Sequence, residues 1–311
     1  MSDYVHTDPA TSEPALTEHD ESQSGSLHTV TRQSALKRTR LTQSKVWPIV
    51  QPVFSAGVWA SSFALMGVTG AACLALEPLV PYRKSHHYLG RPGLGTCVTL
   101  AGAKINITYH EGFDRERRGV FAQNHVNVFD GNLACHIIPH AFCGLMEAWH
   151  FKIPGYGWIM SIAGSIPIYP RKEGRTQEVS DMAKLRAAEG MSILVFPEGH
   201  RTTDGKVHDY RRGVFFMARD AGLPVVPIGV RGAYEVNRKG TWKFTPGPID
   251  VFVGPQFETD GLDEDGITRL ARRLERMTAV YVETGVMPVD DDSLGNPVTR
   301  AESKQSAEAS S

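Results

Sequence analysis

Apolar patterns along the chain predict five β-strands. Residues 104–110 alternate apolar and polar side chains, which is typical of a half-buried strand. Four further apolar runs predict more deeply buried strands, at residues 119–123, 192–196, 224–230 and 249–253.

Helical spacing of apolar residues predicts four helices in the same region. The clearest covers residues 264–283, where one face carries Ile267, Leu270, Leu274, Met277 and Tyr281. The other three are expected at residues 131–148, 177–188 and 210–221. Strands that alternate with helices in this way predict an α/β domain, with a central sheet flanked by helices.

A long uncharged stretch precedes these elements. No charged residue occurs from Val46 to Leu76, and about 20 apolar residues are enough to cross a bilayer. The stretch contains Pro48 and Pro52 and has basic residues on both sides, which favours a re-entrant helical hairpin with both ends in the cytoplasm. A single span and a core helix of a soluble protein are the alternatives. We expect membrane contact, with the protein on the cytoplasmic face.

Charge divides the chain into a basic body and acidic tails. Its 311 residues carry a formal net charge of −1, but residues 1–30 hold six acidic and no basic side chains. Residues 285–311 hold five acidic and two basic side chains, which leaves +8 on residues 31–284. A basic body suits anionic lipid headgroups, although a solvated surface has a similar composition.

The tails have few large apolar residues and are expected to be disordered. We therefore expect a disordered tail at residues 1–36, a membrane-associated helical segment and linker at 37–95, a catalytic domain at 96–286 and a second disordered tail at 287–311. The four cysteines form no CxxC pair and are interpreted as reduced thiols of an intracellular protein.

Several common site types have no sequence signal. There is no P-loop, no GxGxxG and no GxSxG, so neither a nucleotide site nor a lipase nucleophile is expected. His136 and His140 have the i, i+4 spacing of metal ligands, but no third ligand is suitably placed. A polar helix face is the preferred interpretation, with no metal and no cofactor.

Two motifs 73 positions apart carry the candidate chemistry. NHVNVFD places His125 five residues before Asp130, about 500° apart on a helix, so the two cannot share one helical face. We expect His125 in a loop after a strand and Asp130 in the first turn of the next helix, where its carboxylate fixes the imidazole tautomer. FPEGHRT brings Glu198, Gly199 and Arg201 to a strand's end. Together the motifs predict a site that activates a hydroxyl group on a phosphate-bearing substrate.

Four blocks in order resemble the glycerolipid acyltransferases, the lysophosphatidic acid acyltransferase family. They are NHVNVFD, SIPIYPR ending at Arg171, FPEGHRT, and VPIGV around Pro227, and the resemblance covers roughly residues 104–232. The second block has Ser165 and Ile168 where the family usually has Gly and Phe. The third has His200 where the family usually has Thr.

The resemblance implies transfer of a fatty acyl group from acyl-CoA or acyl carrier protein to 1-acylglycerol-3-phosphate, forming phosphatidic acid. It implies that His125 is the base and Asp130 its partner. The implied substrate-binding residues are Asn124, Arg171, Glu198, Gly199 and Arg201. The implied partners are the acyl donor, a lysophospholipid acceptor and the membrane, with no nucleic acid.

Two other functions remain open. The acceptor could be glycerol-3-phosphate, another lysophospholipid or a lyso-aminolipid, because the departures in the blocks leave the chemistry intact but leave the acceptor undetermined. A noncatalytic lipid-binding module could keep the same fold. The presence of His125, Asp130 and Glu198 together favours an enzyme.

Overall fold

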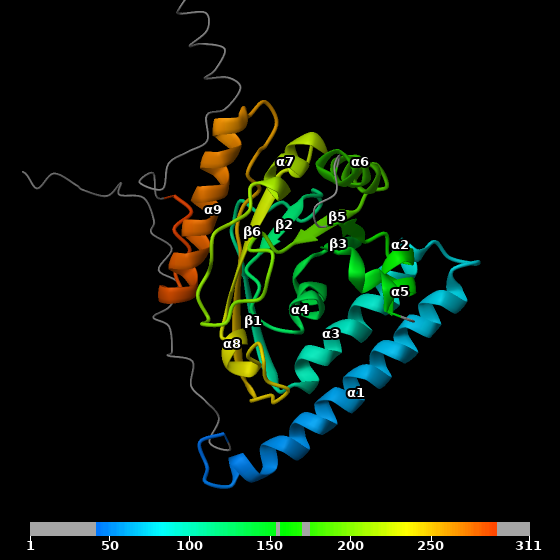
Figure 1. Cartoon of the computed structure of the whole chain (residues 1–311), viewed down its shortest axis with the longest axis vertical. Helices are drawn as coiled ribbons and strands as arrows, with labels where there is room; N and C mark the ends of the chain where they lie inside the picture. Colours follow the sequence, from blue (N-terminus) through cyan, green and yellow to red (C-terminus); the bar gives the residue numbers. More distant parts are fainter. Residues whose placement is uncertain (1–41, 154–155, 170–174, 291–311) are drawn as a thin grey trace, which may run out of the picture. The chain divides into compact units, whose positions relative to one another are not determined.

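A seven-stranded sheet in the order β1-β7-β6-β2-β5-β3-β4 forms the centre of the computed structural model, which describes residues 42–153, 156–169 and 175–290 (Figure 1). The strands are β1 (Ala103–Tyr109), β2 (Val120–Gln123), β3 (Phe142–Glu147), β4 (Ile166–Ile168), β5 (Ser192–Val195), β6 (Val225–Arg231) and β7 (Gly247–Val253). Strands β6, β2, β5, β3 and β4 are parallel, whereas β7 is antiparallel to β6. The carboxyl ends of five strands therefore meet at one edge, where α/β sheets place their chemistry.

Helices cover both faces of the sheet. They are α1 (Trp47–Leu76), α2 (Tyr82–Ser85), η1 (His86–Gly90), α3 (Arg91–Leu100), α4 (Asp130–Ile137), η2 (Ala148–Lys152), α5 (Tyr156–Ile162), α6 (Arg175–Ala188), α7 (Gly213–Asp220), α8 (Ala233–Val236) and α9 (Glu264–Thr284). Side chains from α1, α3 and α4 join one core, and side chains from α6, α7 and α9 join the other. In β2, Phe121 belongs to the first core and its neighbours Val120 and Ala122 to the second, as the alternation of a strand requires.

The five predicted strands are confirmed, and so is the α/β class. The helix predicted at residues 131–148 is wrong in its second half. Helix α4 ends at Ile137, the next residue is extended, and Pro139 follows, which cannot continue a helix. Phe142–Glu147 then form β3 between β5 and β4. Strand β4 was not predicted, because it has only three residues and contains Pro167, which an edge strand tolerates.

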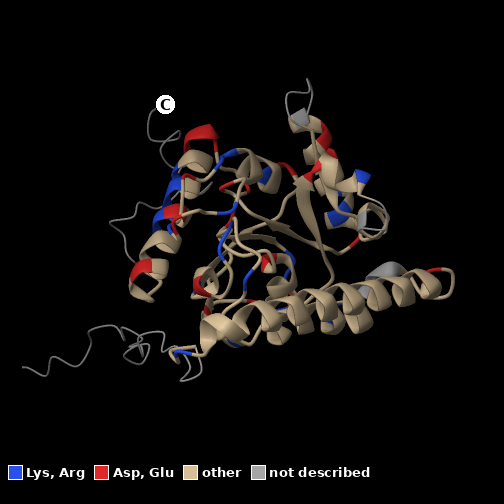
Figure 2. Ribbon diagram, turned by 60° about the horizontal axis from the view of Figure 1, so that its bottom comes forward, with Lys and Arg blue, Asp and Glu red and all other residues tan. Residues whose placement is uncertain are grey.

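The hairpin expected within residues 46–76 is wrong, because α1 is one continuous helix of 30 residues. Pro48 lies in its first turn, where a backbone N–H has no helical partner to lose, and the helix continues through Pro52. By length and composition α1 can cross a membrane, and Figure 2 shows it without charged residues along its length.

Both faces of α1 carry large apolar residues. On the inner face, Val58 and Trp59 pack on the core beside small and polar residues. Gln51 Nε2 donates to Thr245 Oγ1 at 2.8 Å, and Ser55 Oγ accepts from the Phe244 N–H at 2.9 Å. The outer face exposes further apolar residues, including Val53 at 75% exposure and Val68 at 68%. Helix α1 is thus held to the domain by apolar packing and hydrogen bonds, and it also presents apolar residues outward.

Candidate active site

The loop after β2 carries His125, and Asp130 is the first residue of α4. His125 Nδ1 lies 2.8 Å from Asp130 Oδ2, so the bend expected from the five-residue spacing is present. The Asp130 side chain is 1% exposed, whereas that of His125 is 24% exposed. The carboxylate is therefore internal, and the imidazole reaches the surface of the site.

Asp130 Oδ2 accepts three hydrogen bonds. Besides His125 Nδ1, it accepts the backbone N–H groups of Val126 at 2.6 Å and Asn127 at 2.8 Å. An ionised carboxylate can only accept hydrogen bonds, so the hydrogen between the two side chains belongs to Nδ1. In the neutral imidazole, Nε2 is then left unprotonated and can take a proton from a substrate.

Glu198, in the loop after β5, connects two loops of the site. Its Oε1 accepts the His125 N–H at 2.8 Å, and its Oε2 accepts the His208 N–H at 3.0 Å. The side chain is 2% exposed. Burial raises the pKa of Glu198, and the two backbone N–H groups act in the opposite direction by stabilising the carboxylate. Both contacts are to backbone groups, whereas the resemblance implied that Glu198 binds substrate.

Two further contacts hold the histidine loop against the loop after β5. The Phe196 ring stacks on the His125 imidazole, with centroids 4.0 Å apart and planes at 16°. The Thr202 N–H donates to the His125 carbonyl at 2.8 Å. The imidazole is therefore fixed by its ring plane, by Nδ1 and by both backbone groups of its own residue.

Gly199 and Arg201 lie beyond Glu198 in the same loop. Gly199 has φ +75°, and a Cβ there would lie 2.6 Å from Cζ of Arg211, so any larger residue is both strained and obstructed. Arg201 is partly exposed, and its carbonyl accepts Lys239 Nζ at 3.2 Å. Arg171 lies outside the described residues.

The Asn124 side chain links the end of β2 to β6 by two hydrogen bonds. It is 2% exposed, its Nδ2 donates to the Val230 carbonyl at 2.9 Å, and its Oδ1 accepts the Val230 N–H at 2.7 Å. Leaving these buried groups of Val230 without partners would be costly. Asn124 thus connects the end of β2 to β6 directly before His125.

The two histidines weighed as metal ligands serve packing. His136 Nε2 contacts the Gly95 carbonyl at 2.9 Å, while His140 contacts the Arg115 carbonyl and Ser192 Oγ, both at 2.9 Å. Burial lowers the pKa of His140 to about 4, so its ring is neutral. Within the described ranges, no three His, Cys, Asp or Glu side chains are grouped to hold a metal ion.

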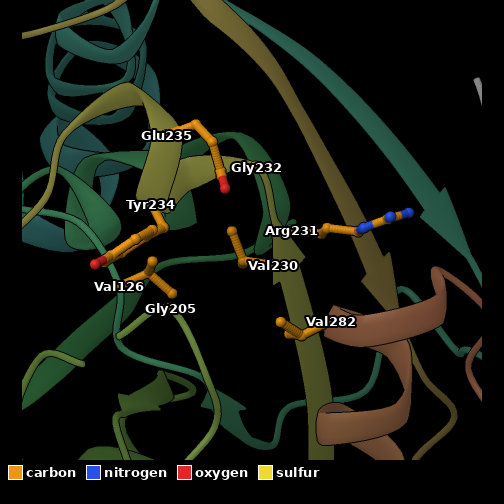
Figure 3. A pocket seen from close by; sticks show the side chains of 8 residues that line it. All are labelled: Val126, Gly205, Val230, Arg231, Gly232, Tyr234, Glu235 and Val282. Carbon is orange, nitrogen blue, oxygen red and sulfur yellow. The ribbon is translucent and has the colours of Figure 1, made fainter. Parts of the chain in front are cut away.

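A cavity of about 210 Å³ adjoins the histidine loop. Val126, Gly205, Val230 and Tyr234 line it, while Figure 3 shows the Arg231 side chain extending away from these residues. Pockets for drug-sized ligands measure about 300–1,000 Å³. This cavity is therefore too small to enclose a lipid or a coenzyme.

Sequence reasoning missed how the histidine loop is supported. Phe196 was noted only as the first residue of the FPEGHRT motif. Its stacking on His125 depends on the pairing of β2 with β5, which the sequence does not show. His208 contributes a backbone N–H, which any residue except proline would supply, so no side-chain pattern marks it.

Comparison with known proteins finds similarity to acyltransferases. Residues 104–231 match the family model described as Acyltransferase. The chain is 25% identical over 203 residues to a 1-acyl-sn-glycerol-3-phosphate acyltransferase of Limnanthes alba, covering 65% of this chain and 70% of the relative. It is 27% identical over 186 residues to 1-acyl-sn-glycerol-3-phosphate acyltransferase alpha of Homo sapiens, covering 59% and 66%.

The fold has a solved counterpart. The crystal structure of the 1-acyl-sn-glycerophosphate (LPA) acyltransferase PlsC from Thermotoga maritima aligns with a TM-score of 0.64 at 21% identity. The alignment covers 76% of this chain and 96% of that one. The solved structure agrees in fold, residues 104–231 match an acyltransferase domain, and the relatives indicate that the enzyme is an O-acyltransferase.

Proposed function

We propose that this enzyme transfers a fatty acyl group from acyl-CoA or acyl carrier protein to the free hydroxyl of 1-acylglycerol-3-phosphate, forming phosphatidic acid. The observation that carries the proposal is the 2.8 Å contact between His125 Nδ1 and the buried Asp130 carboxylate. It supports a general base at Nε2. The names of the relatives support the choice of acceptor.

His125 Nε2 removes the proton from the acceptor hydroxyl as the oxygen attacks the thioester carbon. The C–O bond forms, the C–S bond breaks, and the imidazolium returns its proton to the departing thiolate. Asp130 stabilises the imidazolium through Nδ1. The acyl group passes directly to the acceptor, so no covalent acyl-enzyme is required.

Arg201 and Arg171 hold the acceptor phosphate. A guanidinium can donate two parallel hydrogen bonds to phosphate oxygens, which an ammonium group does not match in geometry. Arg201 lies three residues after Glu198, which bonds to the His125 backbone, so the cation and the base belong to connected loops. Gly199 lets the backbone turn between them at φ +75°.

Glu198 and Asn124 act as positioning residues. Glu198 is buried with both oxygens on backbone N–H groups, and Asn124 is paired with Val230. Each fixes one side of the loop that presents His125. Their part in substrate binding is therefore indirect, through the placement of the base.

We assign residues 96–286 to the catalytic domain and the region before it to membrane association at the cytoplasmic face. The outward apolar face of α1 supports this assignment. An acceptor with one long acyl chain resides in a bilayer, so an enzyme held at the membrane meets it directly.

His125→Ala is expected to lower phosphatidic acid formation by about 10²–10⁴-fold, because the base is lost. The assay follows a labelled acyl group from acyl-CoA to 1-acylglycerol-3-phosphate with purified full-length protein. His110→Ala is the control, since His110 Nδ1 accepts only the nearby Gly112 N–H at the end of β1. Turnover near that of the unmodified enzyme in the His125 variant would show that the base is wrongly assigned.

Arg201→Lys is expected to raise the KM for the acceptor about tenfold, because the bidentate guanidinium group is replaced by an ammonium group. The KM for acyl-CoA is expected to change little. Arg272→Lys, on the exposed side of α9, serves as the control. Equal weakening toward both substrates would count against a role in phosphate recognition.

Glu198→Gln is expected to lower kcat by about tenfold with little change in either KM. Glutamine has one acceptor oxygen, so its NH₂ group faces one of the two backbone N–H groups, at a cost of about 1.5–3 kcal/mol. Steady-state kinetics and thermal unfolding should be measured together. Glu258→Gln, which removes a carboxylate from the exposed pair with Arg117, is the control. An unchanged kcat in the Glu198 variant would refute the positioning role.

A further inference from the structure

A second exposed apolar surface lies next to α1. It consists of Trp149 in η2, Ile153 directly after η2, and Trp158 and Ile162 in α5, which are called the aromatic patch below. The two tryptophans are 55% and 67% exposed, and the two isoleucines are each 37% exposed. The patch belongs to η2 and α5, which follow β3, and has no part in the contacts around His125.

Two glycines fix α5 in place. A Cβ at Gly70 of α1 would lie 2.5 Å from Ile159 Cδ1, so the absence of a side chain there lets α5 pack directly on α1. At Gly157 a Cβ would collide with the Phe151 carbonyl, so α5 also packs closely on η2. Trp158 lies between Gly157 and Ile159 in sequence and is 67% exposed, so neither contact covers it. Figure 1 shows α5 beside α1.

The orientation of Trp149 is also fixed. Its Nε1 donates to Glu147 Oε2 at 2.8 Å, and its ring stacks on His150 with centroids 3.9 Å apart. A tryptophan with an apolar ring exposed and its N–H bonded to a polar group has the character of residues at a membrane-water interface. The exposed Lys152 lies within the same segment and can meet anionic headgroups.

Many exposed apolar residues lie on these elements. Among the large exposed apolar residues of the described part of the chain, α1 carries Ile49, Val50, Val53, Phe63, Val68 and Leu76, η2 carries Trp149, and α5 carries Trp158 and Ile162. Single exposed apolar residues need no explanation, but a contiguous group marks an interaction site. The neighbouring surface is α1, whose outer face is uncharged and apolar over 30 residues. A bilayer is the partner whose chemistry fits both surfaces at once.

We propose that the aromatic patch is a second membrane contact, which inserts Trp149 and Trp158 at the bilayer interface beside α1. Anchoring through α1 alone gives contact along a single line, about which helix and domain can tilt together relative to the lipid surface. A second contact on η2 and α5 removes that freedom and gives the domain one orientation toward the lipid surface. This inference rests on the proposed membrane association of α1, and the experiment separates the two.

The test uses full-length protein reconstituted into vesicles of phosphatidylcholine and phosphatidylglycerol, with every tryptophan replaced by 5-fluorotryptophan during expression. Signals are assigned by single Trp→Phe variants, and a spin-labelled phosphatidylcholine is then added. We expect loss of the Trp149 and Trp158 fluorine signals. Leu185→Trp places one added signal on exposed α6 as the negative control, and Phe63→Trp places one on the outer face of α1.

Four results would contradict the inference. Loss of the signal at position 63 with retention of the Trp149 and Trp158 signals would refute the aromatic patch and leave the α1 anchor standing. Retention of all three signals would refute both. Equal loss at position 185 would show contact without orientation, which also overturns the proposal. Cross-linking between copies through the patch, with the tryptophan signals retained, would assign the patch to self-association instead.

Discussion

The carboxylate of Asp130 is the group on which the arrangement of the site depends. One oxygen accepts the imidazole N–H of His125 and the backbone N–H groups of Val126 and Asn127. The two backbone bonds shape the turn between β2 and α4, and the bond to Nδ1 fixes the tautomer of the histidine. Charge-assisted hydrogen bonds are roughly twice as strong as neutral ones, so the turn and the imidazole are stabilised by a single buried charge. Removing that charge would change the loop conformation as well as the chemistry.

The parallel sheet supplies the second half of the arrangement. Strands β2 and β5 are neighbours, so the loops after them meet at the same edge although their motifs are 73 residues apart. Glu198 bridges the gap by accepting the His125 N–H, and Phe196 stacks on the ring from the same side. The base is thus held by two loops and not by one. This support explains how a surface histidine can keep the fixed orientation that proton transfer requires.

The sequence was sufficient to predict structure where the deciding contacts join residues close in the chain, or where a motif marks the end of a strand. The five-residue spacing of His125 and Asp130 requires a bend, and β2 followed by α4 provides it. Helix α9 was recognisable from its apolar period, with ends within one residue of those observed. The four blocks pointed to the acyltransferases because they occur in a fixed order along the chain, in or directly after strands of the sheet.

Predictions failed where pairing between distant segments decides the structure. The sequence after α4 fits a helix by composition. Phe142–Glu147 nevertheless form β3, which pairs in parallel with β5. Proline in residues 46–76 indicated a break, but α1 is continuous. Its inner face is held to the domain by apolar packing and by hydrogen bonds of Gln51 and Ser55 with residues 244 and 245. The roles of Asn124 and Glu198 were also hidden, since both bond to backbone groups whose positions depend on the sheet.

The tautomer of His125 tests the central claim most directly. Nitrogen-15 spectra of histidine-labelled full-length protein in detergent micelles, with the His125 signals assigned by their loss in His125→Ala, report which ring nitrogen carries the hydrogen. At a pH where the ring is neutral, the account predicts a protonated Nδ1 and an unprotonated Nε2, and it predicts that Asp130→Asn removes this preference. A neutral His125 protonated at Nε2 in the unmodified enzyme would contradict the account, because no base would then face the acceptor hydroxyl.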